Sequence, residues 1–261
     1  MRPHSDQPAA YVDRMTVIGI DIGGTGIKGA PVDVRRGGLT ADRVRLLTPR
    51  SKKPADIIDV IADIVGRFDA PTSIGVTFPG VVSGGLIRTA ANLDKSWIGV
   101  DLAALVHDKF GVHVAAINDA DAAGVAEGAH GAAKGVRGVV LLLTFGTGVG
   151  SGMLLDGKLV PNTELGHLEM NGKDAEKQVA EVVREKKKLS WKKWAGAATQ
   201  YLALVEELFS PDLIVIGGGI DRVQDKWLPL LKAHAPIKVA TLGNNAGIVG
   251  AAMAAQRKRN S

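Results

Sequence analysis

Short apolar runs rich in β-branched residues alternate along the chain with segments whose apolar residues recur every three or four positions. The first pattern predicts strands and the second predicts helices. The expected strands are residues 16–21, 26–34, 73–78, 112–117, 138–144 and 213–216. The expected helices are residues 54–71, 101–110, 120–130, 175–187, 191–209 and a last one from about residue 246. This alternation predicts an α/β protein.

The chain contains an internal echo. Residues 18–25 and 141–148 each read as an apolar strand that enters a glycine-rich turn and then a second strand. At a constant offset of 123 residues, Asp21 meets Thr144, Gly23 meets Gly146, Gly29 meets Gly152 and Asp33 meets Asp156. Such self-similarity predicts a duplicated hairpin unit, with one copy in each of two subdomains.

Composition and charge narrow the classes of function. The 261 residues contain no cysteine, which excludes disulfides, thiolate zinc sites and thiol nucleophiles and fits a cytoplasmic protein. No apolar window is long enough to span a membrane, and we expect residues 1–15 to be a flexible polar lead-in. A net charge of +5 indicates either an anionic partner, such as nucleic acid, an acidic surface or a phosphorylated substrate, or merely a solubilising surface.

The two glycine-rich turns are candidates for binding phosphate. Glycine allows positive φ and a close approach of anions to successive backbone N–H groups, and Thr25 and Thr147 add hydroxyl donors. The spacing matches neither the P-loop nor the usual dinucleotide fingerprint. Either turn alone could be a structural hairpin. Together, on opposing subdomains, they could hold successive phosphates across a closing cleft.

Residues 21–28, with the sequence DIGGTGIK, resemble the first phosphate motif of the ROK family of sugar kinases. The resemblance covers nearly the whole chain. Residues 143–152 are similar to the second phosphate motif, 118–121 to the catalytic segment, 164–167 to the sugar-binding segment and 216–219 to the nucleotide-side turn. It implies the actin-like ATPase fold, a duplicated ribonuclease H-like arrangement of two subdomains with a cleft. We expect residues 16–117 plus 246–261 to form the small N-terminal subdomain and residues 118–245 the large one.

Within this family, four segments resemble the short members that use inorganic polyphosphate: residues 88–99, 144–148, 161–164 and 244–253. Many other members carry a cysteine-rich zinc motif after the Gly-His pair, where this chain has the cysteine-free residues 172–176, so no zinc is expected. The resemblance implies transfer of a phosphoryl group from polyphosphate, ATP or both to the 6-hydroxyl of glucose, with Mg²⁺ as cofactor, by a homodimer. The sequence leaves open glucose against mannose and polyphosphate against ATP.

The resemblance also assigns roles to single residues. Asp119 is the expected catalytic base, although locally it could simply cap a helix, and Asp121 is expected to be structural. Asp21 is expected to hold Mg²⁺, directly or through water. The expected sugar-binding residues are Asn118, Asp119, Glu164, His167, Glu176, Asn92 and Gly80. The expected phosphate-binding residues are Gly23, Gly24, Thr25, Lys28, Thr144, Gly146, Thr147 and Gly148, and a nucleotide would lie near Gly217, Gly218 and Gly219.

One basic run has two interpretations. Against the single acid Glu185, it contains the basic residues Arg184, Lys186, Lys187, Lys188, Lys192 and Lys193. It is either a solvated helical face or a track for a long polyanion, and nucleic acid would suit the same charges although we do not expect it as a partner.

Three other functions compete with the expected one. An ATP-only hexokinase of the same family is the first alternative. The second is a sugar-sensing DNA-binding regulator, but the helix-turn-helix domain of such proteins has no room before a first strand that starts near Thr16. The third is a non-enzymatic actin-like filament protein, in which Asp119, Glu164 and His167 would have no purpose.

Overall fold

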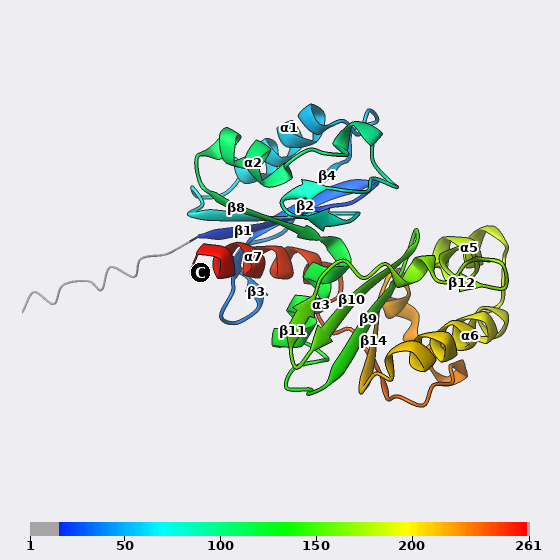
Figure 1. Cartoon of the computed structure of the whole chain (residues 1–261). Helices are drawn as coiled ribbons and strands as arrows, with labels where there is room; N and C mark the ends of the chain where they lie inside the picture. Colours follow the sequence, from blue (N-terminus) through cyan, green and yellow to red (C-terminus); the bar gives the residue numbers. More distant parts are fainter. Residues whose placement is uncertain (1–15, 260–261) are drawn as a thin grey trace, which may run out of the picture.

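The computed structural model describes residues 16–259, so the expected flexibility of residues 1–15 lies outside the described part of the chain. Two β-sheets lie in two halves of the molecule, each accompanied by helices (Figure 1). The helices are α1 (Pro54–Val65), α2 (Leu102–Phe110), α3 (Asp119–His130), α4 (Glu176–Val179), α5 (Glu181–Lys186), α6 (Trp191–Phe209) and α7 (Ala246–Arg259). The 3₁₀ segments are η1 (Lys95–Trp97), η2 (Leu165–His167), η3 (Gly219–Lys226), η4 (Leu228–Leu230) and η5 (Gly243–Asn245).

The first sheet is built from the first half of the chain. Its strands lie in the order β3 (Gly38–Leu39), β2 (Gly26–Asp33), β1 (Val17–Ile22), β5 (Ser73–Phe78) and β8 (His113–Asn118), and β4 (Val44–Leu47) also pairs with β2. Strand β1 is antiparallel to β2 and parallel to β5, which is parallel to β8. A small hairpin of β6 (Val82–Ser83) and β7 (Leu86–Ile87) follows β5.

The second sheet repeats this plan. Its strands lie in the order β11 (Lys158–Val160), β10 (Val149–Leu155), β9 (Val139–Phe145), β14 (Leu213–Gly218) and β15 (Ile237–Val239). Strand β9 is antiparallel to β10 and parallel to β14, as β1 is to β2 and β5. A separate hairpin joins β12 (Glu169–Met170) to β13 (Lys173–Asp174). Two sheets with the same strand directions agree with the predicted duplication.

The constant offset of 123 residues is correct only up to the turns. The first turn holds four residues between the paired Ile22 and Ile27, whereas the second holds three between the paired Phe145 and Val149. Beyond the turns the two copies are therefore shifted by one residue. The predicted matches of Gly29 with Gly152 and of Asp33 with Asp156 are wrong, because those residues do not occupy equivalent ladder positions.

The helices depart from prediction at two places. The helix that starts at Pro54 ends at Val65, so the predicted extent to residue 71 is too long. The predicted helical region over 175–187 is confirmed but interrupted, because Ala180 has an extended ψ of 147° that separates α4 from α5. The helix at Leu102 is confirmed with Asp101 as its N-cap, whose Oδ1 accepts from the Ala104 N–H at 2.9 Å. Within residues 16–259, none of the helices combines the length and apolarity that crossing a bilayer requires.

The last helix packs directly against the first sheet. Helix α7 lies on the face opposite α1 and α2 (Figure 1). A Cβ atom added to Gly19 would lie 1.9 Å from the Ile248 carbonyl oxygen, and one added to Gly75 would lie 1.8 Å from the Ala251 oxygen. The helix can approach this closely only because β1 and β5 present glycine there. This packing brings the closing helix to the first sheet, and the exact residue boundaries of the two subdomains stay a prediction.

Candidate active site

A cavity of about 690 Å³ opens where the strand ends of the two sheets face each other. Residues from both glycine-rich turns, from the start of α3 and from the segment around η2 line it together. The predicted residues that line it are Asp21, Gly23, Gly24, Thr25, Lys28, Gly80, Asn92, Asn118, Asp119, Thr144, Gly146, Thr147, Gly148, Glu164, His167, Glu176 and Gly218. Nearly all of the predicted site is therefore gathered in one place.

The first turn is anchored by Asp21 at the end of β1. Its Oδ2 lies 2.9 Å from the Lys28 Nζ across the hairpin, and its Oδ1 accepts from the Thr77 hydroxyl at 2.9 Å. The Thr77 Oγ1 in turn accepts from the Ile22 N–H at 3.1 Å. This chain of contacts fixes the Asp21 carboxylate at the base of the turn. The Gly23 N–H donates to the Gly26 carbonyl at 3.0 Å and closes the turn itself.

The second turn is braced by neighbouring segments. The Gly146 N–H donates to the Gly148 carbonyl at 3.0 Å, and the Gly146 carbonyl accepts from the Val182 N–H of α5 at 3.1 Å. Gly218, at the end of β14, has φ +92°, and a Cβ there would lie 2.4 Å from the Phe145 oxygen. Only glycine fits this position, so β14 can end directly beside the turn.

Helix α3 begins at the floor of the cavity. Asn118 is its N-cap, because the Asn118 Oδ1 accepts from the Asp121 N–H at 3.0 Å. The alternative that Asp119 serves as the cap is therefore wrong. The Asn118 Nδ2 donates to the Gly80 carbonyl at 3.1 Å, which leaves its second N–H available to a ligand. Asp121 is buried, and its Oδ2 accepts from the Asn162 N–H at 2.7 Å.

The carboxyl group of Asp119 has a strongly raised pKa. Burial raises the pKa of its carboxyl to about 7, and the nearby negative charges of Asp21 and Glu164 act in the same direction. The Ala120 N–H donates to Asp119 Oδ1 at 2.8 Å and partly opposes this rise in pKa. A carboxyl with a pKa near neutrality can accept a proton and later release it, which suits a general base.

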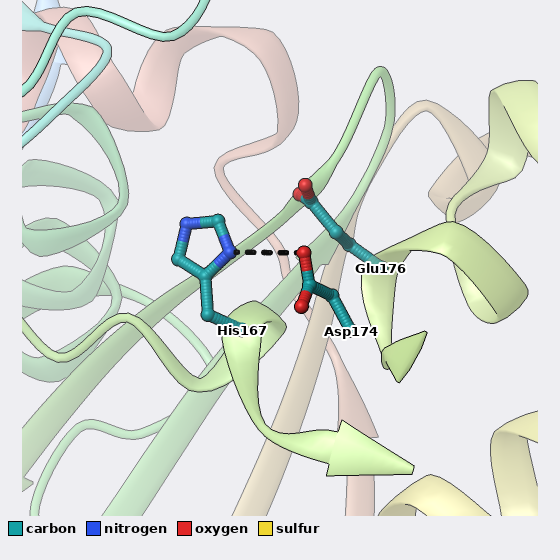
Figure 2. A group of neighbouring side chains, drawn as sticks. All are labelled: His167, Asp174 and Glu176. Atoms are coloured by element: carbon teal, nitrogen blue, oxygen red, sulfur yellow. Dashed lines mark ion pairs between the residues drawn. The ribbon is translucent and has the colours of Figure 1, made fainter. Parts of the chain in front are cut away.

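The opposite wall carries a cluster of acids and one histidine. Burial raises the pKa of Glu164, the nearby His167 lowers it and Glu176 raises it. The His167 Nε2 lies 3.9 Å from Glu164 Oε2, and its Nδ1 lies 3.8 Å from Asp174 Oδ2. Glu176 bends towards the second turn, where its Oε2 accepts from the Val149 N–H at 3.4 Å. Figure 2 shows His167, Asp174 and Glu176 gathered in this way.

These three side chains also form a group of possible metal ligands. One ligand atom from each of His167, Asp174 and Glu176 lies within 4.8 Å of the others. The Lys177 Nζ lies 2.8 Å from Asp174 Oδ2, and this contact lowers the pKa of Asp174. The Lys177 ammonium group therefore already neutralises the charge of Asp174 without a metal ion. The expectation that no zinc is bound remains a prediction.

Some predicted residues lie elsewhere. Gly217, Gly219 and the six basic residues of the 184–193 run are not part of the cavity lining. Conversely, the structure adds lining residues that the sequence analysis missed, among them Arg43, Arg45, Thr89, Ser151, Arg222 and Asn244. The alternation of Arg43 and Arg45 with Val44 and Leu46 is the signal that could have revealed β4, which carries Arg45 and directly follows Arg43.

Comparison with known proteins agrees with this geometry. The sequence model of the ROK family matches residues 17–180. The chain belongs to the ROK family. A polyphosphate glucokinase of Mycobacterium tuberculosis (strain ATCC 25618 / H37Rv) is 49% identical over 251 residues, which cover 96% of this chain and 94% of that relative.

Solved structures of ROK proteins resemble the whole fold. The inorganic polyphosphate/ATP-glucomannokinase of Arthrobacter sp. strain KM matches with a TM-score of 0.89 and 47% identity, covering 93% of this chain and 99% of that one. The ROK family glucokinase of Streptomyces griseus, solved with glucose and AMPPNP, matches with a TM-score of 0.80 and 24% identity, covering 93% and 99%. The predicted actin-like ATPase fold of the ROK sugar kinases is thereby confirmed.

Proposed function

We propose that this ROK protein transfers the terminal phosphoryl group of inorganic polyphosphate, or the γ-phosphoryl group of ATP, to the 6-hydroxyl of glucose. The observation that carries the proposal is the position of Asp119, whose carboxyl has a pKa raised to about 7 and lies in a cavity lined by both glycine turns. The relative from M. tuberculosis is named a polyphosphate glucokinase, and the Arthrobacter neighbour a polyphosphate/ATP-glucomannokinase.

The proposed reaction uses the chain's own residues as follows. The sugar hydroxyls are held by Glu164, His167, Glu176 and Asn118. A sugar that lacks one of these hydroxyls would leave a polar group of the site unpaired. The Asp119 carboxylate accepts the proton of the 6-hydroxyl while that oxygen bonds to the terminal phosphorus. The bond from this phosphorus to the bridging oxygen breaks. The products are glucose 6-phosphate and a polyphosphate chain shortened by one unit, or ADP.

The two turns and Lys28 surround the phosphates of the donor in this proposal. The backbone N–H groups of Gly24 and Gly148 and the hydroxyls of Thr25, Thr144 and Thr147 supply donors without bringing a negative charge close. The N–H groups of Gly23 and Gly146 close the two turns themselves. Such fixed donors stabilise charge that develops on phosphate oxygens, because they need no rearrangement during transfer.

Mg²⁺ is part of the proposal, and the residues present suit it. The carboxylates of Asp21 and Asp119 are close enough that the charge of the first raises the pKa of the second. A hard cation with oxygen ligands would relieve this repulsion, and Asp21 is the residue that would hold it, directly or through water. When bound, Mg²⁺ would neutralise charge on the donor phosphates.

ATP remains a donor within the same proposal, because the cavity extends beyond the phosphate turns. Gly218 and Arg222 line this further part, where a nucleoside could lie. Mannose is the second acceptor to test. We also propose a cytoplasmic homodimer on the strength of the family resemblance, and sedimentation equilibrium of the purified chain would test its assembly.

The decisive experiment is steady-state kinetics with polyphosphate or ATP as donor and glucose, mannose, fructose or N-acetylglucosamine as acceptor, at fixed Mg²⁺. We expect glucose 6-phosphate to form with both donors and turnover to stop when EDTA removes the divalent cation. If the protein turned over ATP and not polyphosphate, it would be the ATP-only hexokinase of the first alternative. A purified protein that phosphorylates none of these sugars would overturn the proposal.

A further inference from the structure

Three basic side chains stand in a row beside the first turn. Lys28 on β2 and Arg45 on β4 are register partners, so their side chains share one face of the sheet. Arg43 lies two residues before Arg45, just ahead of β4, and all three residues line the cavity. Figure 1 shows β4 beside β2 in the first sheet. The phosphate cradle thus continues into a row of positive charges, here called the β4 stripe.

The three members of the β4 stripe are engaged differently. Lys28 is paired with Asp21 at 2.9 Å. Arg43 is held in place, because its Nη1 donates to the Asn244 carbonyl at 3.2 Å and to the Asn245 Oδ1 at 3.0 Å. Arg45 is exposed, and among residues 16–259 no hydrogen bond or ion pair engages its guanidinium. The stripe therefore offers one positioned guanidinium and one that is free to bind.

The β4 stripe leads from the turn to the outside. The Arg45 guanidinium lies over Gly26, where an added Cβ would be 2.7 Å from its Nη2. Arg43 and Asn245 also line a second, shallower hollow together with residues 39–42, among which Asp42 is the one acid. An extended anion that left the first turn along β4 would pass Arg45 and then Arg43.

We propose that the β4 stripe binds the distal phosphates of an inorganic polyphosphate chain whose terminal phosphoryl group lies at Asp119. This inference rests on the proposed function and adds a binding site to it. Guanidinium groups suit the task, because their planar fork binds phosphate oxygens bidentately. After its third phosphate ATP carries a nucleoside, which the proposed function places towards Gly218 and Arg222, whereas a longer polyphosphate can continue along β4. The stripe therefore favours the long inorganic donor.

The basic run at 184–193 is the competing track, and the structure gives it less support. None of its six basic residues lines the cavity. The Arg184 guanidinium lies 4.1 Å from the Trp191 ring centroid and pairs with Glu185 at 3.6 Å, so it holds α5 against α6. Its lysines are exposed and lie apart from the first turn, whereas the β4 stripe adjoins it.

The test compares the double variant Arg43→Gln/Arg45→Gln with the wild-type chain, using tripolyphosphate, long-chain polyphosphate and ATP as donors. We expect KM for the long chain to rise about tenfold, because two charge-assisted contacts are lost. KM for ATP and tripolyphosphate should rise much less than KM for the long chain, since those donors extend less far along β4. The salt dependence of long-chain binding should also become shallower. Arg67→Gln, an exposed arginine after α1, is the matched control.

Equilibrium binding of long-chain polyphosphate to the same proteins separates the two proposals. If wild-type protein binds polyphosphate through the two arginines but turns over only ATP, the proposed donor is wrong and the binding site stands. Equal affinity of wild type and double variant would overturn the site. An equal rise of KM for all three donors in the double variant would also overturn the site. The same holds if KM rises with donor length in Lys186→Gln/Lys192→Gln and not in the arginine variant. Arg45→Lys should recover only part of the affinity, because it restores the charge without the fork.

Discussion

The side-chain amide of Asn162 pairs with both backbone groups of Val82. The Val82 N–H donates to Asn162 Oδ1 at 2.9 Å, and the Asn162 Nδ2 donates to the Val82 carbonyl at 3.0 Å. Val82 begins the small hairpin that follows β5 of the first sheet, whereas Asn162 follows β11 of the second. The Asn162 N–H also donates to Asp121, two residues from Asp119. This one side chain thus links the two halves of the molecule, two residues before the predicted sugar-binding Glu164.

Asn162→Gly should lower the free energy of unfolding by about 2 kcal/mol, because two hydrogen bonds are lost and their partners are left in a partly buried place. Glycine is the informative replacement, since Asn162 has φ +60° and alanine there would add backbone strain. We also expect KM for glucose to rise severalfold, because Glu164 follows two residues later. Urea unfolding and glucose kinetics measure both effects.

The control for this prediction is Asn171→Gly. Asn171 also has positive φ, 53°, but it is exposed and makes only long contacts of 3.4 to 3.5 Å with glutamine side chains. Its replacement should leave the free energy of unfolding within about 0.5 kcal/mol of wild type. Equal losses at the two positions would show that the pairing with Val82 contributes nothing specific.

Asp119→Asn should lower kcat by about 10²- to 10⁴-fold while glucose still binds, because the amide cannot accept the proton of the 6-hydroxyl. Kinetics gives the first quantity, and glucose titration followed by intrinsic fluorescence or calorimetry gives the second. The companion variant Asp121→Asn should lose far less turnover, since Asp121 contacts the Asn162 backbone rather than the cavity. Near-normal turnover of Asp119→Asn would refute the assignment of the base.

Local sequence patterns predict the parts of this fold that are locally encoded. The β-branched strands and the glycine turns that follow them need only neighbouring residues for their recognition. The strand at Ser73–Phe78 and the helix at Trp191–Phe209 have the predicted bounds. Because the equivalent strand ends of both sheets meet at one cavity, the motifs that follow those strands were predictable as one site.

The missed features depend on contacts between distant segments. Val82 and Asn162 are 80 residues apart, and no local pattern predicts that an asparagine will pair with a particular backbone segment. Strand β4 is short and half exposed, and its pairing with β2 decides that Arg45 stands beside Lys28. The error in the internal offset is of the same kind, since a turn shorter by one residue becomes visible only in the ladder register.

The raised pKa of Asp119 also predicts a pH-dependent stability difference. The folded protein keeps the proton of Asp119 up to a pH of about 7, whereas an unfolded chain releases it near its ordinary value of 3.8. Between these values the folded state binds more protons, so this group's contribution to stability is lost as the pH rises to about 7. Asp119→Asn has no such group.

The metal-free and sugar-free Asp119→Asn protein should therefore melt at a higher temperature than wild type at pH 8. The difference in melting temperature between the two proteins should narrow as the pH falls from 7 towards 5, because wild-type Asp119 is then protonated in the folded state. Thermal unfolding at several pH values checks this, with Asp101→Asn as a control variant at a partly exposed helix cap. A gap that is the same at every pH would mean that Asp119 does not titrate near 7.

The close packing of α7 on the first sheet makes Gly75 intolerant of a side chain. A Cβ at Gly75 would lie 1.8 Å from the Ala251 oxygen and 2.7 Å from the Ala252 nitrogen, and both are backbone atoms that cannot rotate away. Gly75→Ala should therefore cost about 3 kcal/mol or more, or prevent folding, because β5 and α7 must separate. Gly38→Ala, on the edge strand β3 with no atom within 4 Å of the added Cβ, should unfold at nearly the wild-type urea concentration. If the two variants unfolded at the same urea concentration, α7 could not pack on β5 as closely as described. The contact of the Asp21 carboxylate with Gly247 of the same helix would then be in doubt too, because it depends on the same packing.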